Sequence, residues 1–341
     1  MSGSRAVEAV LASSSRRWLV TGAAGFIGSH LAEALLRGGQ RVVALDNFST
    51  GHRSNLEGVL AAVPGARERF ELHEADVRDL DQCRRACEGV ELVLHQAALG
   101  SVPRSVADPR TSHDVNVTGH MNVLLAAREK GAARVVYASS SSVYGDHPAL
   151  PKTEENVGRQ LSPYAVTKYA NELYAHVFGG AYGMELIGLR YFNVFGPRQD
   201  PDGPYAAVMP QWFAGLLQGR DVFINGDGET SRDFCHVANV VQANLLAATT
   251  RSADAVNRVY NVAFGQRTTL NELFGLIRAQ VARVRPEAAS ARPVFRDFRP
   301  GDVRHSLADI TRARELLGYE PTHDVAAGLN ETAAWYAASV R

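Results

Sequence analysis

A tyrosine and a lysine lie four positions apart in the stretch SPYAVTK, as Tyr164 and Lys168. Ser162 and Pro163 are a typical cap and first residue of a helix, so we expect Tyr164 and Lys168 on one helical face. A tyrosine phenol has a pKa of about 10, and a lysine ammonium beside it lowers that pKa. The pair can therefore take up and return a proton. A surface tyrosine–lysine pair is the alternative.

The stretch ASSSSVYG places Ser140, Ser141 and Ser142 after an apolar run, RVVY, that predicts a buried strand. Serine is a weak strand former, and buried hydroxyl groups need hydrogen-bond partners. The run is therefore either a turn whose hydroxyls satisfy backbone groups or a set of polar groups placed for chemistry.

The stretch TGAAGFIG has glycines at Gly22, Gly25 and Gly28, between a predicted strand and a predicted helix. Glycines in this context let the backbone and the first helical amides approach a pyrophosphate. Asp46 ends the next predicted strand, where a carboxylate binds adenosine ribose hydroxyls and repels a 2′-phosphate. NAD is thus favoured over NADP, although Arg53 lies nearby. A plain glycine-rich turn is the alternative.

Alternating elements must position these groups. We expect strands at Trp18–Gly22, Arg41–Asp46, Phe70–Asp76, Leu92–Ala98, Arg134–Ala138 and Leu186–Tyr191. Helices are expected at Gly25–Arg37, at Leu80–Cys87, within Asp108–Lys130 and at Ser162–Phe178. This alternation predicts an α/β fold with a Rossmann-like, doubly wound parallel sheet, which binds ligands at its carboxyl edge.

The regular alternation ends after Asn193, where a segment rich in Gly, Pro and Asp begins. The last third mixes short helices with isolated strands such as Val259–Ala263. We therefore expect a surface arm or short helix at 1–15, a dinucleotide-binding domain at 16–193 with 234–264 packing back on it, and a smaller C-terminal α/β substrate lobe at 194–341.

The bulk composition excludes several classes of partner. The chain has 341 residues with 36 basic and 36 acidic side chains, so no net field gathers nucleic acid or an anionic membrane. No run approaches the ~18 apolar residues of a membrane span, and the short apolar stretch near the N-terminus contains Glu8. We expect a cytoplasmic protein with neither a nucleic-acid nor a membrane partner.

The cysteines and histidines are expected to be ordinary. Cys83, Cys87 and Cys235 are too few for a disulfide framework and have no histidine cluster beside them in the sequence. No metal-ligand spacing is found among His30, His95, His113, His120 and His236. We therefore expect buried thiols and no metal.

Taken together, TGAAGFIG, Asp46, the serine run and Tyr164-x-x-x-Lys168 resemble the extended short-chain dehydrogenases/reductases, over nearly the whole chain. DNFSTG, YFNVFGPRQ and SRDFCHV resemble the nucleotide-sugar branch, the NAD-dependent epimerases and dehydratases. HQAALGSVPRS, RQDPDGPYAAVMP and GDVRHS are more similar still to bacterial UDP-N-acetylglucosamine (UDP-GalNAc) 4-epimerases.

The resemblance implies that NAD binds at the carboxyl edge of the sheet. Asp76 and Val77 would flank the adenine, and Lys168 would reach the nicotinamide ribose. The expected cofactor-binding residues are Gly22, Gly25, Phe26, Ile27, Gly28, Asp46, Asn47, Asp76, Val77, Ala97, Ala98, Leu99, Asn116, Lys168 and Phe192.

The resemblance also implies chemistry at the sugar C4. Ser140 would bind the 4-hydroxyl and Tyr164 would take its proton while hydride moves to NAD, with Lys168 poising the tyrosine. Related 4,6-dehydratases carry Thr-Asp-Glu at these three serine positions, so Ser141 and Ser142 provide no acid for elimination. The 4-keto sugar is then expected to rotate and take hydride back on its other face. Whether Ser141 or Ser142 can replace Ser140 stays open.

Other positions match substrate contacts of the family. Arg232 and Arg299 match arginines that bind the diphosphate, and Asn193 matches a residue on the diphosphate or sugar. Ser306 stands where a small residue leaves room for a 2-N-acetyl group, and a harmless surface serine is the alternative. The remaining matches are Gly100 and Ser101 beside the hexose, Ala207, Val208 and Phe223 beside the uracil, and Asp302 on a uridine ribose hydroxyl or on the neighbouring arginine.

These features predict reversible C4 epimerisation of UDP-GlcNAc and UDP-GalNAc, with surface polysaccharide synthesis as the pathway by analogy. One alternative is a 4-epimerase for UDP-hexuronates, with Arg104 on the carboxylate, or for UDP-glucose and UDP-galactose. The others are a net NAD-dependent oxidoreductase and a non-catalytic dinucleotide-binding regulator. Such regulators typically lack the tyrosine or lysine, and both Tyr164 and Lys168 are present.

Two predicted helices, within Asn116–Arg128 and Tyr164–Phe178, carry more apolar residues than the cofactor side needs. By resemblance, they predict a homodimer with a four-helix interface; an internal core is the alternative. The residues concerned are Leu124, Leu125, Leu173, Val177 and Phe178.

Overall fold

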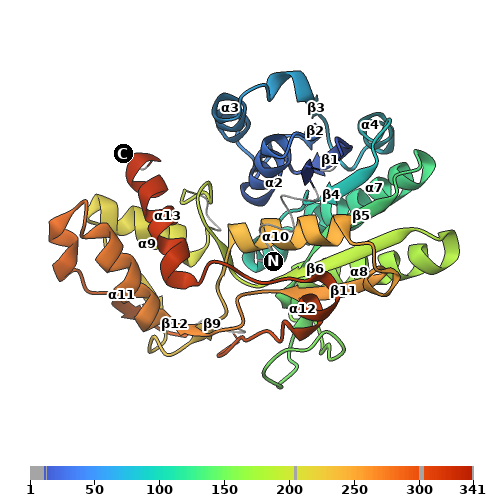
Figure 1. Cartoon of the computed structure of the whole chain (residues 1–341). Helices are drawn as coiled ribbons and strands as arrows, with labels where there is room; N and C mark the ends of the chain where they lie inside the picture. The colour runs from blue at the N-terminus through green and yellow to red at the C-terminus, as the bar shows by residue number, and fades with distance from the viewer. Residues whose placement is uncertain (1–10, 13, 203–205, 299–302, 340–341) are drawn as a thin grey trace.

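The structure, a computed structural model, describes residues 11–12, 14–202, 206–298 and 303–339. Its centre is a seven-stranded parallel sheet with the strand order β11-β6-β5-β4-β1-β2-β3 (Figure 1). The strands are β1 (Arg17–Thr21), β2 (Arg41–Asp46), β3 (Phe70–Glu74), β4 (Leu92–His95), β5 (Arg134–Ser140), β6 (Glu185–Tyr191) and β11 (Arg258–Val262). The predicted doubly wound sheet is confirmed, and its order reverses between β1 and β4.

Helices cover both faces of this sheet, and two apolar cores result. In β1, Trp18 and Val20 face one core and Leu19 faces the other, because successive strand side chains point to opposite faces. The first core includes residues of α2 (Phe26–Arg37), α3 (Arg53–Ala62), α10 (Val237–Thr249) and α12 (Thr311–Leu317). The second includes residues of α4 (Leu80–Ala86), α7 (Gly119–Glu129) and α8 (Pro163–Tyr182).

Several predicted bounds differ from the structure. The long helix expected within Asp108–Lys130 is broken into α6 (Pro109–His113), a π-helical turn at Asp114–Thr118, and α7. The strand expected to reach Ala98 ends at His95, and the strand expected to end at Ala138 continues to Ser140. Helices α3 and α5 (Val102–Ala107) were not predicted. Helix α3 buries only Leu56 and Val59, so its sequence shows only a weak helical periodicity of apolar residues.

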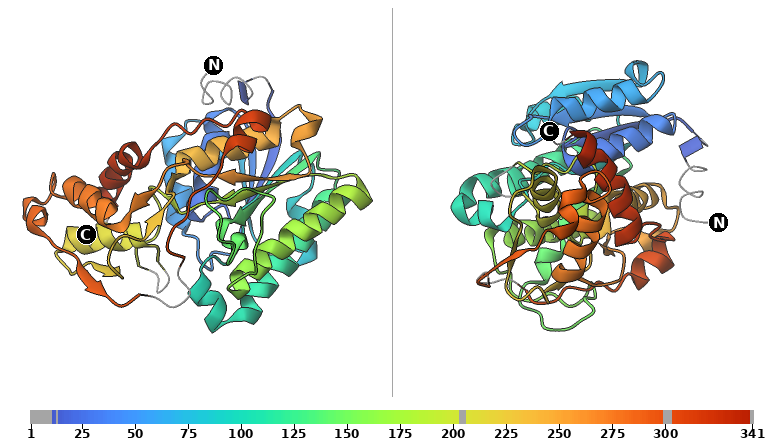
Figure 2. Two further views of the ribbon diagram at one scale, coloured as in Figure 1. Left: turned by 90° about the horizontal axis from the view of Figure 1, so that it is seen from below. Right: turned by 90° about the vertical axis from the view of Figure 1, so that its left-hand side faces the viewer.

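The helices of the C-terminal part lie beside the sheet (Figures 1 and 2). They enclose a third apolar core. Its helices are α9 (Val208–Gln218), α11 (Leu270–Val281) and α13 (Val325–Ser339), which pack around Phe213, Leu273, Leu329 and Tyr336. Three short strand pairs complete it: β7 (Val194–Phe195) with β10 (Cys235–His236), β8 (Phe223–Asn225) with β13 (Val294–Arg296), and β9 (Ser231–Arg232) with β12 (Thr268–Thr269).

One segment of the second half returns to the sheet. Strand β11 pairs with β6 in parallel, and α10 packs against β5 and β6. The strand at Val259–Ala263, which we expected to be isolated, is therefore an edge strand of the main sheet. Short 3-10 turns at Arg67–Arg69, Ser141–Tyr144, Ala253–Ala255 and Pro286–Ser290 connect other elements.

The predicted N-terminal arm lies mostly outside the described residues. Leu11, which is described, is buried in the first core, and its carbonyl accepts a hydrogen bond from Gln40 Nε2 at 2.7 Å. This part of the arm is packed rather than on the surface. The three cysteines are free buried thiols, as expected, and burial raises the pKa of Cys83 to about 12. Among the described helices, none is long and apolar enough to span a membrane.

Candidate active site

The glycine loop joins β1 to α2 at the point where the strand order reverses. Gly22 has a φ of +67°, and a Cβ on it would lie 2.8 Å from the Ala97 backbone nitrogen. A Cβ on Gly28 would lie 2.0 Å from the Gly22 carbonyl oxygen. Neither position admits a side chain, so the backbone and the start of α2 form an open cradle. That cradle fits a dinucleotide pyrophosphate.

Asp46 lies at the end of β2, next to the cradle. One carboxylate oxygen accepts the Ala24 amide at 2.8 Å, and the other accepts the Phe48 amide at 2.8 Å. Burial raises the pKa of Asp46, and these two backbone hydrogen bonds oppose the shift. The side chain is thus held rigidly where a ribose diol would bind.

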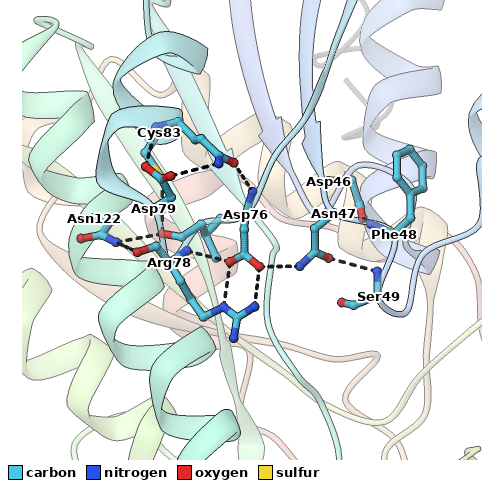
Figure 3. A network of polar contacts seen from close by, with 11 residues as sticks. Asp46, Asn47, Phe48, Ser49, Asp76, Arg78, Asp79, Cys83 and Asn122 are labelled. Carbon is cyan, nitrogen blue, oxygen red and sulfur yellow. Dashed lines mark hydrogen bonds and ion pairs between the residues drawn. The ribbon is translucent and has the colours of Figure 1, made fainter.

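Polar side chains extend this end of the site (Figure 3). Asn47 donates from Nδ2 to Asp76 Oδ2 at 2.8 Å. Arg78 hydrogen-bonds the same Asp76 carboxylate and is the main reason why its pKa falls to about 2. Asp76 therefore stays ionised, and Asn47 and Asp76 are fixed relative to each other.

Arg53, whose charge kept NADP as a possible cofactor, contacts other side chains in the structure. Its guanidinium pairs with Glu74, and its Cζ lies 4.0 Å from the centroid of the Phe48 ring. A 2′-phosphate would have to break this ion pair and meet the Asp46 carboxylate, which favours NAD.

A cleft of about 360 Å³ runs along the carboxyl edge of the sheet. Its walls include most of the expected cofactor residues: Gly22, Gly25, Phe26, Ile27, Gly28, Asp46, Asn47, Asp76, Val77, Ala97, Ala98, Leu99 and Lys168. Gly100, which we expected beside the hexose, also lines this cleft.

Two expected cofactor residues lie behind the wall. Asn116 is buried, and its amide bonds both the backbone nitrogen of Leu99, at 2.7 Å, and the carbonyl of Leu99, at 3.1 Å. It therefore fixes the loop that forms the wall. Phe192 is fully buried against Tyr144, with ring centroids 5.9 Å apart. Its contact with the cofactor stays a prediction.

Helix α8 brings Tyr164 and Lys168 to the cleft. Ser162 caps the helix as predicted, with its Oγ accepting the Ala165 amide at 3.2 Å. Ser105 Oγ accepts the Tyr164 amide at 3.0 Å, which ties the first turn to α5. Lys168 is buried and donates to the Ala138 carbonyl at 2.9 Å, with its Nζ 6.0 Å from the Tyr164 ring centroid.

The electrostatics of this pair differ from the sequence expectation. Burial raises the pKa of Tyr164, and a hydrogen bond with the Ser140 hydroxyl partly opposes it. Burial also lowers the pKa of Lys168 to about 8. The expected lowering of the tyrosine pKa by Lys168 does not occur in this structure, because desolvation dominates at both groups.

The serine run spans the end of β5 and the following 3-10 turn. Ser140 Oγ accepts the Ser142 amide at 3.1 Å, and the same hydroxyl acts to lower the pKa of Tyr164. Ser142 Oγ is buried and has no hydrogen-bond partner among the described residues. Ser139 Oγ donates to Glu172 at 2.5 Å, and Glu172 in turn pairs with Arg190. The run therefore combines a structural anchor at Ser139 with hydroxyls beside Tyr164.

A second pocket, of about 500 Å³, adjoins the cleft at Tyr164 and Tyr191. The expected residues that line it are Ser101, Ser140, Ser141, Ser142, Tyr164, Asn193, Arg232 and Ser306. Among the described residues, no carboxylate lines this pocket. Its one lysine is Lys152, which donates to the His147 carbonyl.

A third pocket, of about 270 Å³, shares Asn193 and Arg232 with the second. Val208 and Phe223 line it as expected, and the Arg296 guanidinium lies 3.3 Å from the Phe223 ring centroid. The cleft and the two pockets thus form one continuous series of cavities.

Of the residues expected beside the uracil, one that the structure describes does not line this third pocket. Ala207 is exposed at the start of α9, and its carbonyl accepts the Gln211 amide. Arg299 and Asp302 lie outside the described residues.

Sequence reasoning missed several lining residues. Tyr191 lies between cleft and second pocket, and its hydroxyl donates to Gln96 Oε1 at 2.9 Å and accepts from Asn244 Nδ2 at 2.9 Å. Its place at the end of a predicted strand was the available signal. Lys152 lies outside the named helices and strands and Arg296 ends the three-residue strand β13, and neither segment carried a recognisable pattern.

Comparison with known proteins identifies the class. Residues 18–263 match the model of the NAD dependent epimerase/dehydratase family. A UDP-glucose 4-epimerase of Mycolicibacterium smegmatis is 39% identical over 94% of this chain and 98% of its own length. A solved UDP-N-acetylglucosamine 4-epimerase from Methanobrevibacter ruminantium is 36% identical, with a TM-score of 0.87 over 96% of this chain and 99% of that one.

A third relative was solved with its cofactor. The UDP-glucuronic acid 4-epimerase from Bacillus cereus, in complex with UDP-glucuronic acid and NAD, is 28% identical, with a TM-score of 0.82 over 94% of this chain and 98% of that one.

The parallel sheet, the glycine cradle and the tyrosine–lysine pair define a nucleotide-dependent enzyme of the short-chain dehydrogenase/reductase type. The chain belongs to the NAD dependent epimerase/dehydratase family. Its cofactor is NAD.

Proposed function

We propose that this protein interconverts UDP-GlcNAc and UDP-GalNAc by epimerisation at C4. The broader activity, that of an NAD-dependent UDP-sugar 4-epimerase, is supported by the relatives and by the arrangement of the cleft and two pockets. The observation that carries the proposal is the second pocket. It joins Tyr164 and Ser140 to Ser306 and contains no described carboxylate.

The residues of this pocket support a proton relay at the sugar 4-hydroxyl. NAD, when bound, supplies the acceptor and donor of hydride for the sugar C4. A 4-hydroxyl placed between Ser140 and Tyr164 gives its proton to the Tyr164 oxygen when that tyrosine is ionised, and the tyrosine then carries this proton. Lys168, fixed by the Ala138 carbonyl, provides positive charge beside that oxygen. The same groups return the proton after the sugar has turned.

The absence of a carboxylate in the described part of the pocket separates this reaction from dehydration. A 4,6-elimination needs an acid and a base near C5 and C6. The positions after Ser140 provide only the hydroxyls of Ser141 and Ser142. Among the described residues of this pocket, a keto sugar therefore has no partner for elimination, and return of hydride is the outcome that these side chains support.

The main proposal is tested by incubating the purified protein with UDP-GlcNAc, without added NAD, and separating the C4 epimers. We expect conversion to UDP-GalNAc, since the buried cleft retains the cofactor. No conversion of any UDP-sugar, even with added NAD, would sink the proposal of an epimerase.

The choice of N-acetylated sugars rests on Ser306. Its small side chain lines the pocket, and its amide donates to the Ser231 carbonyl at 3.1 Å. We expect Ser306→Tyr to lose turnover of UDP-GlcNAc about tenfold to 100-fold while UDP-glucose turnover persists. Ser306→Ala, which keeps the space open, is the matched control. Unchanged turnover of UDP-GlcNAc in the tyrosine variant means that the acetyl group is accommodated elsewhere.

A UDP-hexuronate is the second candidate substrate, because Lys152 lines the same pocket. An ammonium group there attracts a C6 carboxylate. We expect Lys152→Met to lower kcat/KM for a UDP-hexuronate more than for UDP-GlcNAc if uronates are natural substrates. An equal fall in kcat/KM for both substrates would mean that Lys152 has only a structural role, through its hydrogen bond to His147.

We also propose the domain division at residue 193 and the individual roles of the expected site residues. Support comes from their positions along the three adjoining cavities.

A further inference from the structure

Two histidines and a glutamate meet at a place remote in sequence from the Tyr164–Lys168 pair. His236 ends β10, His323 lies in the loop before α13, and Glu331 lies on α13. One potential ligand atom from each lies within 4.8 Å of the other two. His323 Nε2 is 3.1 Å from Glu331 Oε1, and His236 Nε2 is 4.0 Å from Glu331 Oε2. Because His236 is far from the other two in the sequence, no local spacing revealed this group.

The His236 ring is buried without the hydrogen bonds that a buried imidazole normally makes. Its side chain is 1% exposed, and neither ring nitrogen has a hydrogen-bond partner among the residues that the structure describes. A buried polar group left in this state is costly, so it indicates a ligand that completes it. The ring packs on α13 at Gly328, where a Cβ would lie 2.9 Å from its Cδ2.

The other two groups are held in place but keep access to solvent. Asn239 accepts the His323 amide at 3.1 Å and donates to the His323 carbonyl at 2.8 Å. Thr322 Oγ1 hydrogen-bonds His323 Nδ1 at 2.8 Å, which directs Nε2 toward the group. The Glu331 side chain is 56% exposed and provides both the adaptable ligand and the route of entry.

We propose that His236, His323 and Glu331 bind one divalent transition-metal ion of the zinc class. Two imidazole nitrogens and one carboxylate oxygen form a common ligand set for Zn²⁺, with water in the remaining position. Ligand atoms around zinc are about 3.3 Å apart, as bonds of about 2 Å in a tetrahedron require. The observed distance between His236 Nε2 and Glu331 Oε2 is longer than this. Rotation of the exposed Glu331 side chain and a small movement of the His323 loop bring the ligand atoms close enough to bind one ion. The ion links α13 to the start of α10.

The experiment uses purified, untagged full-length protein near neutral pH. Co²⁺ is titrated while its visible ligand-field absorption is recorded, Zn²⁺ is then added in competition, and Zn²⁺ binding is measured by calorimetry. We expect one saturable site per chain, displacement of Co²⁺ by Zn²⁺, and a rise in the thermal unfolding midpoint with Zn²⁺. None of these readouts depends on epimerase activity.

Glu331→Gln and His323→Asn are the informative variants, because both side chains reach the surface and their loss spares the core. Each is expected to weaken the affinity for Zn²⁺ at least tenfold. Glu71→Gln is the matched control: Glu71 lies 2.7 Å from His73 in an exposed pair with no third ligand among the described residues, so affinity is unchanged. Wild-type protein without saturable binding, or either ligand variant with wild-type affinity, overturns the proposal and leaves an ordinary histidine–glutamate hydrogen bond.

Discussion

Tyr164 combines a raised pKa with a hydroxyl partner at Ser140, and this combination defines its role at the residue scale. Burial disfavours the phenolate, so the tyrosine is held in its protonated form until a substrate and its cofactor complete the site. A hydrogen bond with the Ser140 hydroxyl partly opposes this effect of burial. We propose that Tyr164 accepts the substrate proton only when the substrate and the cofactor occupy the site.

Tyr164→Phe removes the proton acceptor and keeps the ring. We expect kcat for UDP-sugar epimerisation to fall about 10²- to 10⁴-fold, as for loss of a general acid–base group. NAD content and thermal unfolding should stay at wild-type levels. Epimerisation by this variant at the wild-type rate would contradict the proposed role of Tyr164. One of the serines Ser140, Ser141 and Ser142 would then be the next candidate for the proton acceptor.

We propose that Lys168 makes epimerisation sensitive to alkaline pH. Burial lowers its pKa from the ordinary value to about 8, so the ammonium loses its charge as pH rises through that value. The charge that stabilises the tyrosinate is therefore present below about pH 8 and lost above it. We expect kcat to decline on that alkaline side.

The measurement is a pH profile of kcat at saturating UDP-sugar. Lys168→Arg is a useful comparison, because a guanidinium stays charged throughout. If it retains activity, its profile should lack the alkaline decline. A wild-type profile that stays flat well above pH 8 would show that the lysine charge is not required.

At the scale of elements, the loop between β1 and α2 depends on close backbone contact. Gly28→Ala would place a methyl group 2.0 Å from the Gly22 carbonyl oxygen, so the loop or α2 must shift. We expect a loss of about 1–3 kcal/mol in unfolding free energy, typical of overpacking, together with loss of co-purifying NAD. Denaturant unfolding and the absorbance of released cofactor measure the two effects.

Gly58→Ala is the control for this substitution. A Cβ at Gly58 in α3 meets nothing within 4 Å, and alanine favours a helix by about 0.5–1 kcal/mol over glycine. We expect equal or greater stability and unchanged NAD content. Similar losses in the two variants would mean that the clash at Gly28 has no special effect.

Much of the sheet was predictable because most of its strands, unlike the edge strand β3, are buried on both faces and read as apolar runs. The glycine loop, Asp46 and the Ser162 cap are local patterns, and each lies where its pattern indicated. Helix α3 escaped prediction because its apolar face is narrow. Tyr191 and Lys152 escaped because their place on a pocket wall depends on segments far apart in the sequence.

At the scale of the whole molecule, α8 presents an apolar face to solvent. Leu173 and Val177 are 53% and 56% exposed, and Val166 is 54% exposed one or more turns earlier on the helix. By contrast Leu124 and Phe178, which we had grouped with them, lie in the core. The exposed residues support the predicted homodimer, and the buried ones do not bear on it.

Val177→Asp tests that assembly without touching the core. A charge on a covered apolar face is expected to shift the protein to monomers in sedimentation velocity at micromolar concentration. Val284→Asp, at a position 61% exposed near the end of α11, serves as the control and should sediment as the wild type does. If the Val177→Asp variant stays dimeric, the interface lies on another surface of the protein. If the wild type sediments as a monomer, the predicted homodimer is wrong.

The cofactor cleft and the second pocket share only Tyr164 and Tyr191 among their described wall residues. On the proposed function, most of the positions that face the sugar are therefore separate from those that hold the dinucleotide, with Gly100 in the cleft as an exception. Descendants of one ancestral gene can acquire new substrates while inheriting the same redox machinery. The same separation gives an engineer two sets of positions that can be randomised independently, with the two tyrosines kept constant.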